Sequence, residues 1–220
     1  MALRVFAIAL FALFASPFPV AQAETLAPGQ PLNSTPAIAR YVLSKDLIQS
    51  AAIDAGRIDR ELGIACNEGY TVSFKTFTVL RPIEMQPNAT MPSAGAWRIG
   101  YDATRCGSTK RYNNFYGINN SGALVRGMMA PGESIASFQL QTDTLKMAIA
   151  ILNASRKAEN CAAPKLFETR ISMPQQPIGT PWQEEWTILD CGPQLAIKID
   201  FKPTPDGGTD FAVRVPAAAP

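Results

Sequence analysis

The sequence of 220 residues contains no histidine. Without an imidazole the chain cannot form a Ser-His-Asp triad, a Cys-His nucleophile pair or a histidine-ligated metal site. Histidine is also the commonest general base near neutral pH, so proton transfer would fall to carboxylates or to lysine. The S-x-x-K, G-x-S-x-G and Walker-type motifs are absent as well. These absences leave the common hydrolase and nucleotide-dependent classes without a motif in this chain.

Charged residues are few and nearly balanced, with 20 lysines and arginines against 18 aspartates and glutamates. Loss of Arg4 with an N-terminal signal would leave 19 against 18, a net charge of +1. A nucleic-acid surface generally needs a basic stripe that neutralises phosphates. The balance therefore predicts no nucleic-acid partner, and it disfavours attraction to a charged membrane surface.

The N-terminus has the pattern of a secretory signal peptide. Arg4 precedes an apolar run from Val5 to Ala15, and Ala21-Gln22-Ala23 forms a small-x-small cleavage site. We expect residues 1–23 to be removed and the mature chain to begin at Glu24, in the periplasm or outside the cell. No later stretch approaches the roughly 20 apolar residues of a transmembrane helix, so no membrane anchor is expected after cleavage.

Only four cysteines occur, and no two of them form a C-x-x-C pair. That spacing belongs to the common thiol redox motif and to the commonest zinc sites, so neither a cofactor nor a metal is predicted. An even number of cysteines in an exported chain favours disulfides. The four are Cys66, Cys106, Cys161 and Cys191.

Two segments share one spacing of aromatic, cysteine and glycine residues. WRIGYDATRCG spans residues 97–107, and WQEEWTILDCG spans residues 182–192. A helical pattern and a cysteine precede each segment, and turn and strand patterns follow it. We interpret this order as two copies of one unit, over 35–131 and 132–215. The duplication predicts one disulfide in each copy, Cys66 with Cys106 and Cys161 with Cys191.

The helix of the first copy is predicted to begin at Thr35-Pro36, with Thr35 as N-cap, and to end before Gly63. Its apolar stripe leaves Asp59 on another face. The residues before it, 24–34, are expected to form a flexible leader, and 216–220 are expected to form a tail.

The remaining patterns predict a second helix and antiparallel strands. The helical stripe begins after Gly132-Glu133-Ser134, and turn signals occur at 119–122 and 205–208. Connections between the strands are too short for parallel crossovers. The predicted fold class is α+β, with two related helix-plus-antiparallel-meander units and one disulfide in each. The alternative is a single β-sandwich-like domain with two helices. The element order is similar to that of cystatin or of nuclear transport factor 2.

Four aromatic residues of the repeated segments are candidate binding residues. Trp97 and Tyr101 are four residues apart, as are Trp182 and Trp186, so each pair shares one face of a regular strand. Packing against the disulfide and the helix is the favoured interpretation, because each ring buries about 150 to 250 Å². The alternative is an exposed aromatic platform for a sugar or a peptide.

Glu184, Glu185 and Asp190 are the candidates for a paired carboxylate site in the second segment. Neighbouring residues of a strand point to opposite faces, so the two glutamates should diverge. The first copy has no acid at the positions of the glutamates. A solvated strand face is therefore the favoured interpretation of Glu184 and Glu185.

Two further features are candidates for contact with a partner. The densest basic patch contains Arg105, Lys110 and Arg111. Because the second copy lacks this patch, we interpret it as a solvated, partner-facing edge rather than a nucleic-acid site. The Pro-containing loops 87–95 and 176–181 would be the contact points of an inhibitor-like protein.

The C-terminal part carries the pattern Trp182-x3-Trp186-x4-Cys191-Gly192, then Phe201-x-Pro203 and Gly207-Gly208-Thr209-Asp210-Phe211. This pattern resembles one in uncharacterised exported proteins of proteobacteria. The resemblance implies a periplasmic setting and carries over no catalytic or binding residue.

For function, we expect a non-catalytic binding or interaction module that works with an envelope protein or complex. One alternative is a carboxylate-dependent hydrolase of cell-wall or sugar substrates, in which two acids converge in one cleft. A second alternative is a secreted inhibitor-like protein.

Overall fold

The computed structural model describes residues 22–64, 66–155, 164–189 and 194–215, and within them the chain forms two antiparallel sheets. The first has the strand order β1-β2-β3-β4-β5, with bounds Glu24–Leu26, Thr71–Met85, Ala94–Arg105, Ser108–Ile118 and Leu124–Met128. The second, β6-β7-β8-β9, is formed by Lys165–Met173, Trp182–Leu189, Gln194–Pro203 and Thr209–Arg214. The expected tail, most of the expected signal peptide, Cys161, Asp190 and Cys191 lie outside the described residues.

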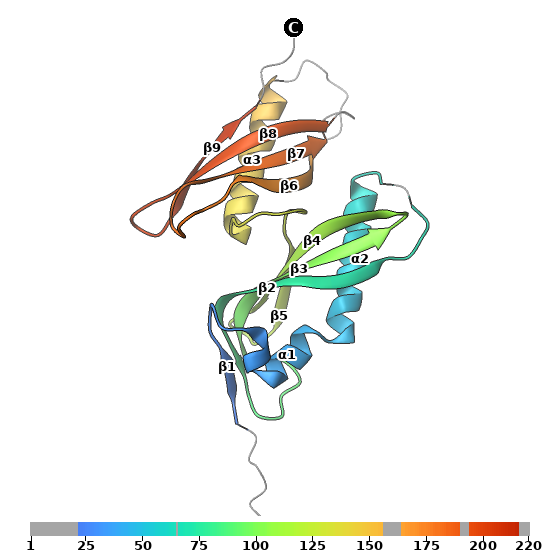
Figure 1. Cartoon of the computed structure of the whole chain (residues 1–220), viewed down its shortest axis with the longest axis vertical. Helices are drawn as coiled ribbons and strands as arrows, with labels where there is room; N and C mark the ends of the chain where they lie inside the picture. Colours follow the sequence, from blue (N-terminus) through green and yellow to red (C-terminus); the bar gives the residue numbers. More distant parts are fainter. Residues whose placement is uncertain (1–21, 65, 156–163, 190–193, 216–220) are drawn as a thin grey trace, which may run out of the picture.

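The helices cover the two sheets (Figure 1). A short 3-10 turn, η1 (Leu32–Ser34), precedes α1 (Pro36–Val42) and α2 (Lys45–Glu61), which pack on the first sheet, and α3 (Phe138–Ser155) packs on the second. The architecture is therefore mixed α+β, as predicted. No helix in the described part of the chain is both long and apolar enough to cross a bilayer.

Residues 24–34 are part of the fold, so the prediction of a flexible leader is wrong. Strand β1 pairs with β2, and Leu26 is fully buried beneath α1. The Glu24 carboxylate accepts hydrogen bonds from the Ala37 and Ile38 amides, at 2.8 and 3.2 Å. An anion at a helix N-terminus satisfies the free amides and the helix dipole. Glu24 therefore caps α1, whereas the predicted N-cap, Thr35, makes no side-chain cap bond.

One predicted helix is found as two, because the chain breaks at Leu43 and Ser44. Ser44 has extended backbone angles, and its Oγ accepts from the Leu47 amide at 3.5 Å. The break resets the helical register, so that α2 turns Asp54 and Asp59 toward the sheet, where both are buried. The expectation that Asp59 lies on another face is therefore wrong.

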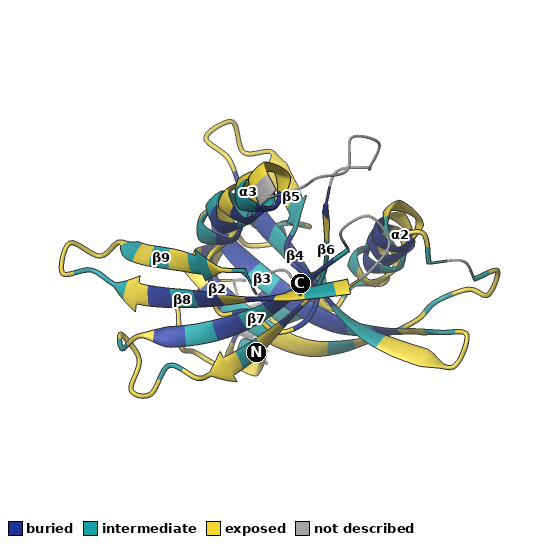
Figure 2. Ribbon diagram, turned by 90° about the horizontal axis from the view of Figure 1, so that it is seen from above, coloured by how far each residue is buried: buried dark blue, intermediate teal, exposed yellow. Residues whose placement is uncertain are grey.

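Each sheet has its own cluster of buried apolar residues. The first joins Trp97, Tyr101 and Tyr116 to α1 and α2, and the second joins Trp182 and Trp186 to α3. Buried positions concentrate in the strands and on the inner sides of the helices (Figure 2). Strand β7 alternates strictly between buried and partly exposed positions, as a strand with one covered face should.

The disulfide between Cys66 and Cys106 confirms the predicted pairing of these two cysteines. It joins the loop after α2 to the end of β3, with the two Cα atoms 6.4 Å apart. The pair closes a segment with a sequence separation of 40 residues, which stabilises the fold by about 4 kcal/mol on the chain-entropy model.

The connection between the sheets is held at Gly132, which forms a parallel bridge with Thr169 of β6. The Glu133 amide donates to the Thr169 carbonyl at 2.7 Å, and the Thr169 amide donates to the Pro131 carbonyl at 2.8 Å. On the other side, the Gly132 amide donates to the carbonyl of Arg111 in β4 at 2.8 Å. The connection is thus bonded to both sheets.

Alanine at position 132 should lower the free energy of unfolding by more than about 2 kcal/mol. Gly132 has φ +91°, and a Cβ there would lie 2.1 Å from the Thr169 carbonyl oxygen. Gly122→Ala is the matched control, because Gly122 has φ +77° in open space and should cost only about 1 kcal/mol. Urea unfolding of both variants measures the difference. If both variants lower the free energy of unfolding by the same amount, the close contact with Thr169 does not restrict the residue at position 132.

Candidate functional site

The aromatic residues of the repeated segments are core residues. Trp97, Tyr101, Trp182 and Trp186 are all buried. Trp97 stacks on Tyr116 with ring centroids 5.7 Å apart, and Trp182 stacks on Phe201 at 4.7 Å. The four rings belong to the apolar clusters that include the helices, so they leave no exposed platform for a sugar at these positions.

Glu184 is fully buried, so the prediction that it lies on a solvated face is wrong. Alternation along β7 places it on the same covered face as Trp182 and Trp186. Its Oε1 accepts from Ser134 Oγ, the Ile135 amide and Trp182 Nε1, at 3.0 to 3.1 Å. Its Oε2 accepts from Trp186 Nε1 at 2.9 Å. A carboxylate with four donors is a structural group rather than a free acid.

Glu184 also connects the second sheet to the first. Ser134, which donates to Glu184, receives at its carbonyl a hydrogen bond from Arg98 Nη1 of β3, at 2.7 Å. Burial lowers the pKa of the Arg98 guanidinium, and the charge of Glu184 opposes that change. The negative charge of Glu184 in the second sheet therefore stabilises the buried positive charge of Arg98 in the first sheet.

Glu185 lies on the opposite face of β7, as the alternation predicts. Its Oε1 is 2.6 Å from Arg170 Nη2, and the arginine is largely exposed. Because Glu184 and Glu185 diverge, the two do not form a catalytic carboxylate pair. The third candidate of this group, Asp190, is outside the described residues.

Most of the predicted basic patch is neutralised inside the fold. Arg111 pairs with Asp102, and this hydrogen bond is the main reason that the pKa of Asp102 is lowered. Arg105 pairs with Asp59 at 3.2 Å. Lys110 differs, because its Nζ is buried without a hydrogen-bond partner among the described residues.

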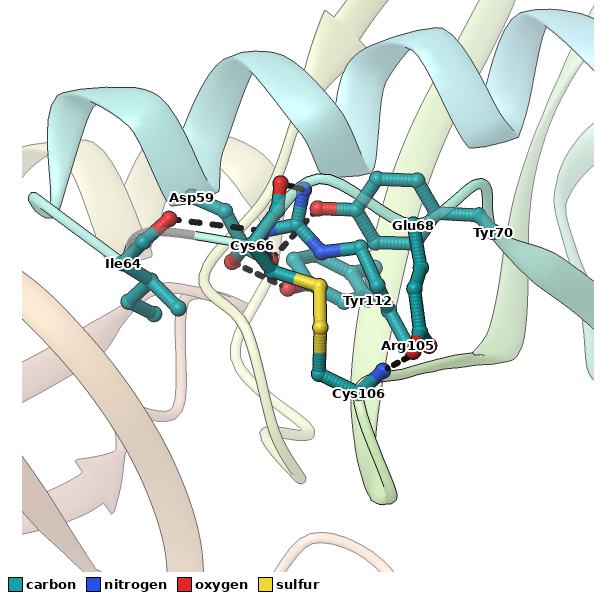
Figure 3. Close-up of polar contacts among 8 residues, drawn as sticks. All are labelled: Asp59, Ile64, Cys66, Glu68, Tyr70, Arg105, Cys106 and Tyr112. Atoms are coloured by element: carbon teal, nitrogen blue, oxygen red, sulfur yellow. Dashed lines mark hydrogen bonds and ion pairs between the residues drawn. A yellow bond between two sulfur atoms is a disulfide. The ribbon is translucent and has the colours of Figure 1, made fainter.

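Asp59 is the centre of a polar cluster that sequence reasoning missed (Figure 3). Its carboxylate accepts from Tyr70 Oη at 2.6 Å, from Tyr112 Oη at 2.5 Å and from Arg105 Nη2 at 3.2 Å. Burial, and then the hydrogen bond to Asp59, raises the pKa of both tyrosines. Arg105 also donates to the Cys66 and Ile64 carbonyls, at 3.2 and 3.4 Å. The cluster thereby fixes the loop after α2.

A cavity of about 330 Å³ lies beside this cluster, and we call it the junction cavity because residues of both sheets line it. It is bounded by the disulfide and by the side chains of Asp59, Tyr70, Arg105, Lys110, Tyr112 and Phe167. Its one lining carboxylate, among the described residues, is that of Asp59, which already has three donors. The cavity does not supply the two converging acids that a glycoside hydrolase needs.

A group of possible metal ligands lies at the rim of the junction cavity. The sulfurs of Cys66 and Cys106 and a Glu68 carboxylate oxygen are within 4.8 Å of one another. Thiolates bind metals, but these sulfurs are joined in a disulfide. The group therefore offers a metal one carboxylate, and Glu68 is engaged by the Cys106 amide at 2.8 Å.

The loop between β6 and β7, residues 174–181, projects into solvent, and we call it the projecting loop. Ile178 in this loop is 94% exposed, the highest value for a large apolar residue in the described part of the chain. The loop is braced by Thr180, whose amide and Oγ1 both donate to the Pro177 carbonyl, at 3.2 and 2.7 Å. Gln175 Nε2 donates to the Thr180 carbonyl at 3.0 Å. These bonds close the loop beneath Ile178.

The corresponding loop of the first sheet is different, because it folds back on its own core. Ala89 and Met91 pack against the first apolar cluster. The Ser93 amide donates to the Glu84 carbonyl at 2.8 Å. Of the two loops singled out from the sequence, the projecting loop is the one that presents an apolar side chain. In the sequence, the feature that could have indicated this exposed side chain is a single isoleucine between Pro177 and Gly179.

No family model, curated protein or solved structure matches the chain.

Proposed function

We propose that the protein is a non-catalytic, exported module of the bacterial envelope that binds a partner protein through the projecting loop. The observation that carries this proposal is Ile178, 94% exposed on a loop braced by its own hydrogen bonds. Transfer of an isoleucine side chain into an apolar pocket contributes about 1.5 to 3 kcal/mol. The partner therefore has an apolar pocket that receives this side chain.

The bracing of the loop supports the same proposal. A flexible loop loses conformational freedom when it binds, and this loss reduces affinity. Thr180 and Gln175 hold the ends of the loop together before any partner is present. Gly179 has φ +92°, a backbone conformation that glycine adopts without steric cost. A loop that is already ordered loses less conformational freedom on binding than a flexible loop does, which favours contact through Ile178.

Duplication is a second part of the proposal: the two sheets are related copies of one helix-plus-meander unit. Trp97 of β3 lies opposite Tyr116 of β4, and Trp182 of β7 lies opposite Phe201 of β8. Both pairs are stacked, with interplanar angles of 10° and 16°. The same ring contact at the same place in two meanders supports a common origin. The loops then differ because one copy has acquired the contact role.

The partner contact is tested by affinity capture from an envelope fraction with the mature protein and two variants. Ile178→Asp places a charge on the projecting loop and should reduce recovery of the partner on the order of tenfold or more. Ile53→Asp is the matched control, since Ile53 is 62% exposed on α2, and it should recover the partner as the native protein does.

Both variants change exposed positions, so their thermal unfolding should match that of the native protein. Recovery of the same proteins in the same amounts by the native protein and by Ile178→Asp would refute the assigned surface. Loss of the partner in both variants would place the contact elsewhere.

A further inference from the structure

Lys110 of β4 is the cation of the junction cavity that forms no ion pair with any described residue. Its Nζ is buried, and no described residue accepts a hydrogen bond from it. The Nζ lies 3.9 Å from the centroid of the Phe167 ring and 5.7 Å from that of Tyr112. Ring faces attract an ammonium group, but they do not replace a hydrogen-bond acceptor. The buried ammonium group of Lys110 therefore lacks the hydrogen-bond acceptor that a charged amine needs among the described residues.

The charges lining the cavity sum to a surplus of one cation. Asp59 and Arg105 compensate each other through their ion pair at 3.2 Å, which leaves Lys110. Two further described acids lie nearby and are exposed: Glu168 of β6, and Glu68 at the rim, whose carboxylate accepts from the Cys106 amide. Arg105 is already bonded to the Asp59 carboxylate and to two carbonyls. The group available to an incoming anion is thus the Lys110 ammonium.

The remaining lining determines the shape of the ligand. Tyr70, Tyr112 and Phe167 contribute aromatic rings, and Ile64 and Ala103 contribute aliphatic surface. A volume of about 330 Å³ is at the lower end of the range for small-molecule sites. A flat apolar body fits such walls, and a single negative charge matches the surplus cation.

We propose that the junction cavity binds a small monocarboxylate with a flat apolar body, such as an aromatic acid, whose carboxylate accepts a hydrogen bond from Lys110. The flexible lysine stem lets Nζ rotate away from the Phe167 ring toward the ligand. A charge-assisted bond then replaces the contact with the ring. Because β4 carries Lys110 and β6 carries Phe167, the ligand contacts both sheets.

The protonation of Lys110 is consistent with this site. Burial lowers the pKa of the Lys110 amine, while Asp59 and Glu168 oppose that change. The other charged or titratable groups at the cavity, among the described residues, are Arg105, Tyr70, Tyr112 and, at its rim, Glu68. A bound carboxylate stabilises the ammonium, so it should raise the pKa of Lys110.

The test compares benzoate with benzamide, which has the same ring and no charge, by isothermal titration calorimetry. Benzoate should bind the native protein on the order of tenfold more tightly than benzamide. Lys110→Met should remove that difference, whereas Lys146→Met, at an exposed position of α3, should preserve it. Lys110→Met should also raise the thermal unfolding midpoint, because it removes a buried unpaired charge.

Three results would overturn the proposal. One is the absence of benzoate binding to the native protein at millimolar concentration. Another is equal affinity for benzoate in the native protein and in Lys110→Met. The third is binding of inorganic phosphate as tight as that of benzoate, which would exclude a role for the aromatic walls.

Discussion

Replacing Glu184 by glutamine should lower the free energy of unfolding by about 3 to 5 kcal/mol. The carboxylate accepts four hydrogen bonds, two of them from the indoles of Trp182 and Trp186. An amide NH₂ would face at least one of these donors, and a buried donor would lose its partner. The substitution also removes the negative charge that compensates Arg98. Chemical denaturation followed by tryptophan fluorescence measures the loss.

The neighbouring residue provides the control for this experiment. Glu185→Gln removes a carboxylate that pairs with Arg170 at the surface, and it should cost less than about 1 kcal/mol. If Glu184→Gln lowers the free energy of unfolding no more than Glu185→Gln does, the buried carboxylate does not stabilise the contact between the two sheets.

Alkaline pH should unfold the protein cooperatively above pH 10. Burial raises the pKa of Tyr101 and Tyr112 well above their ordinary value of 10.0. The unfolded chain releases these protons near pH 10 while the folded chain retains them, so stability present below pH 10 is lost as the pH rises. Each such phenol contributes a slope of about 1.4 kcal/mol per pH unit, and the raised pKa of Tyr70 adds to the effect of Tyr101 and Tyr112.

Lys110 has the opposite effect on the pH dependence of stability, and its effect falls at a lower pH than that of the tyrosines. Its pKa in the folded protein is lowered from the ordinary value of 10.5, so stability rises with pH until the unfolded chain also loses that proton. Above pH 10.5 this contribution is constant, because Lys110 has then lost its proton in both the folded and the unfolded chain.

Phenolate absorbance and circular dichroism, recorded together during an alkaline titration, measure the effect. The phenolate signal of the buried tyrosines should appear only as the fold is lost. Tyr112→Phe should reduce the slope of stability against pH by about 1.4 kcal/mol per pH unit. Ionisation of all the tyrosines near pH 10 with the fold intact would contradict the buried positions of Tyr101 and Tyr112.

Much of the first sheet could be predicted from local patterns. Alternating residues, short connections and turn signals indicated antiparallel meanders, and the repeat predicted the pairing of Cys66 with Cys106, which the structure confirms. The break before α2 was missed because Ser44 is one cap residue within a pattern that otherwise continues. Without the break, the faces of α2 and the burial of Asp59 were assigned wrongly.

Glu184 shows what local reasoning lacked. A period of two places it beside Trp182 and Trp186, and this could have been deduced from the spacing alone. Its burial, however, requires donors from Ser134 and Ile135, which are distant in sequence. A charged residue on a covered face is stable only with such partners. Sequence alone therefore favoured the solvated interpretation.

The candidate site was only partly predictable. Pro-containing loops were identified from composition, but composition does not distinguish a loop that folds on the core from one that projects. Ala89 and Met91 find apolar partners, whereas Ile178 is left in solvent. The junction cavity, likewise, depends on Phe167 meeting Lys110 across two sheets.

Site-specific photo-crosslinking in the native envelope tests the central proposal most directly. A photoreactive phenylalanine at position 178 should form a discrete adduct with one partner protein, and the same residue at position 53 on α2 should not. An Ile178 site that yields no adduct, or the same adducts as position 53, would contradict the assignment of the projecting loop as the contact surface.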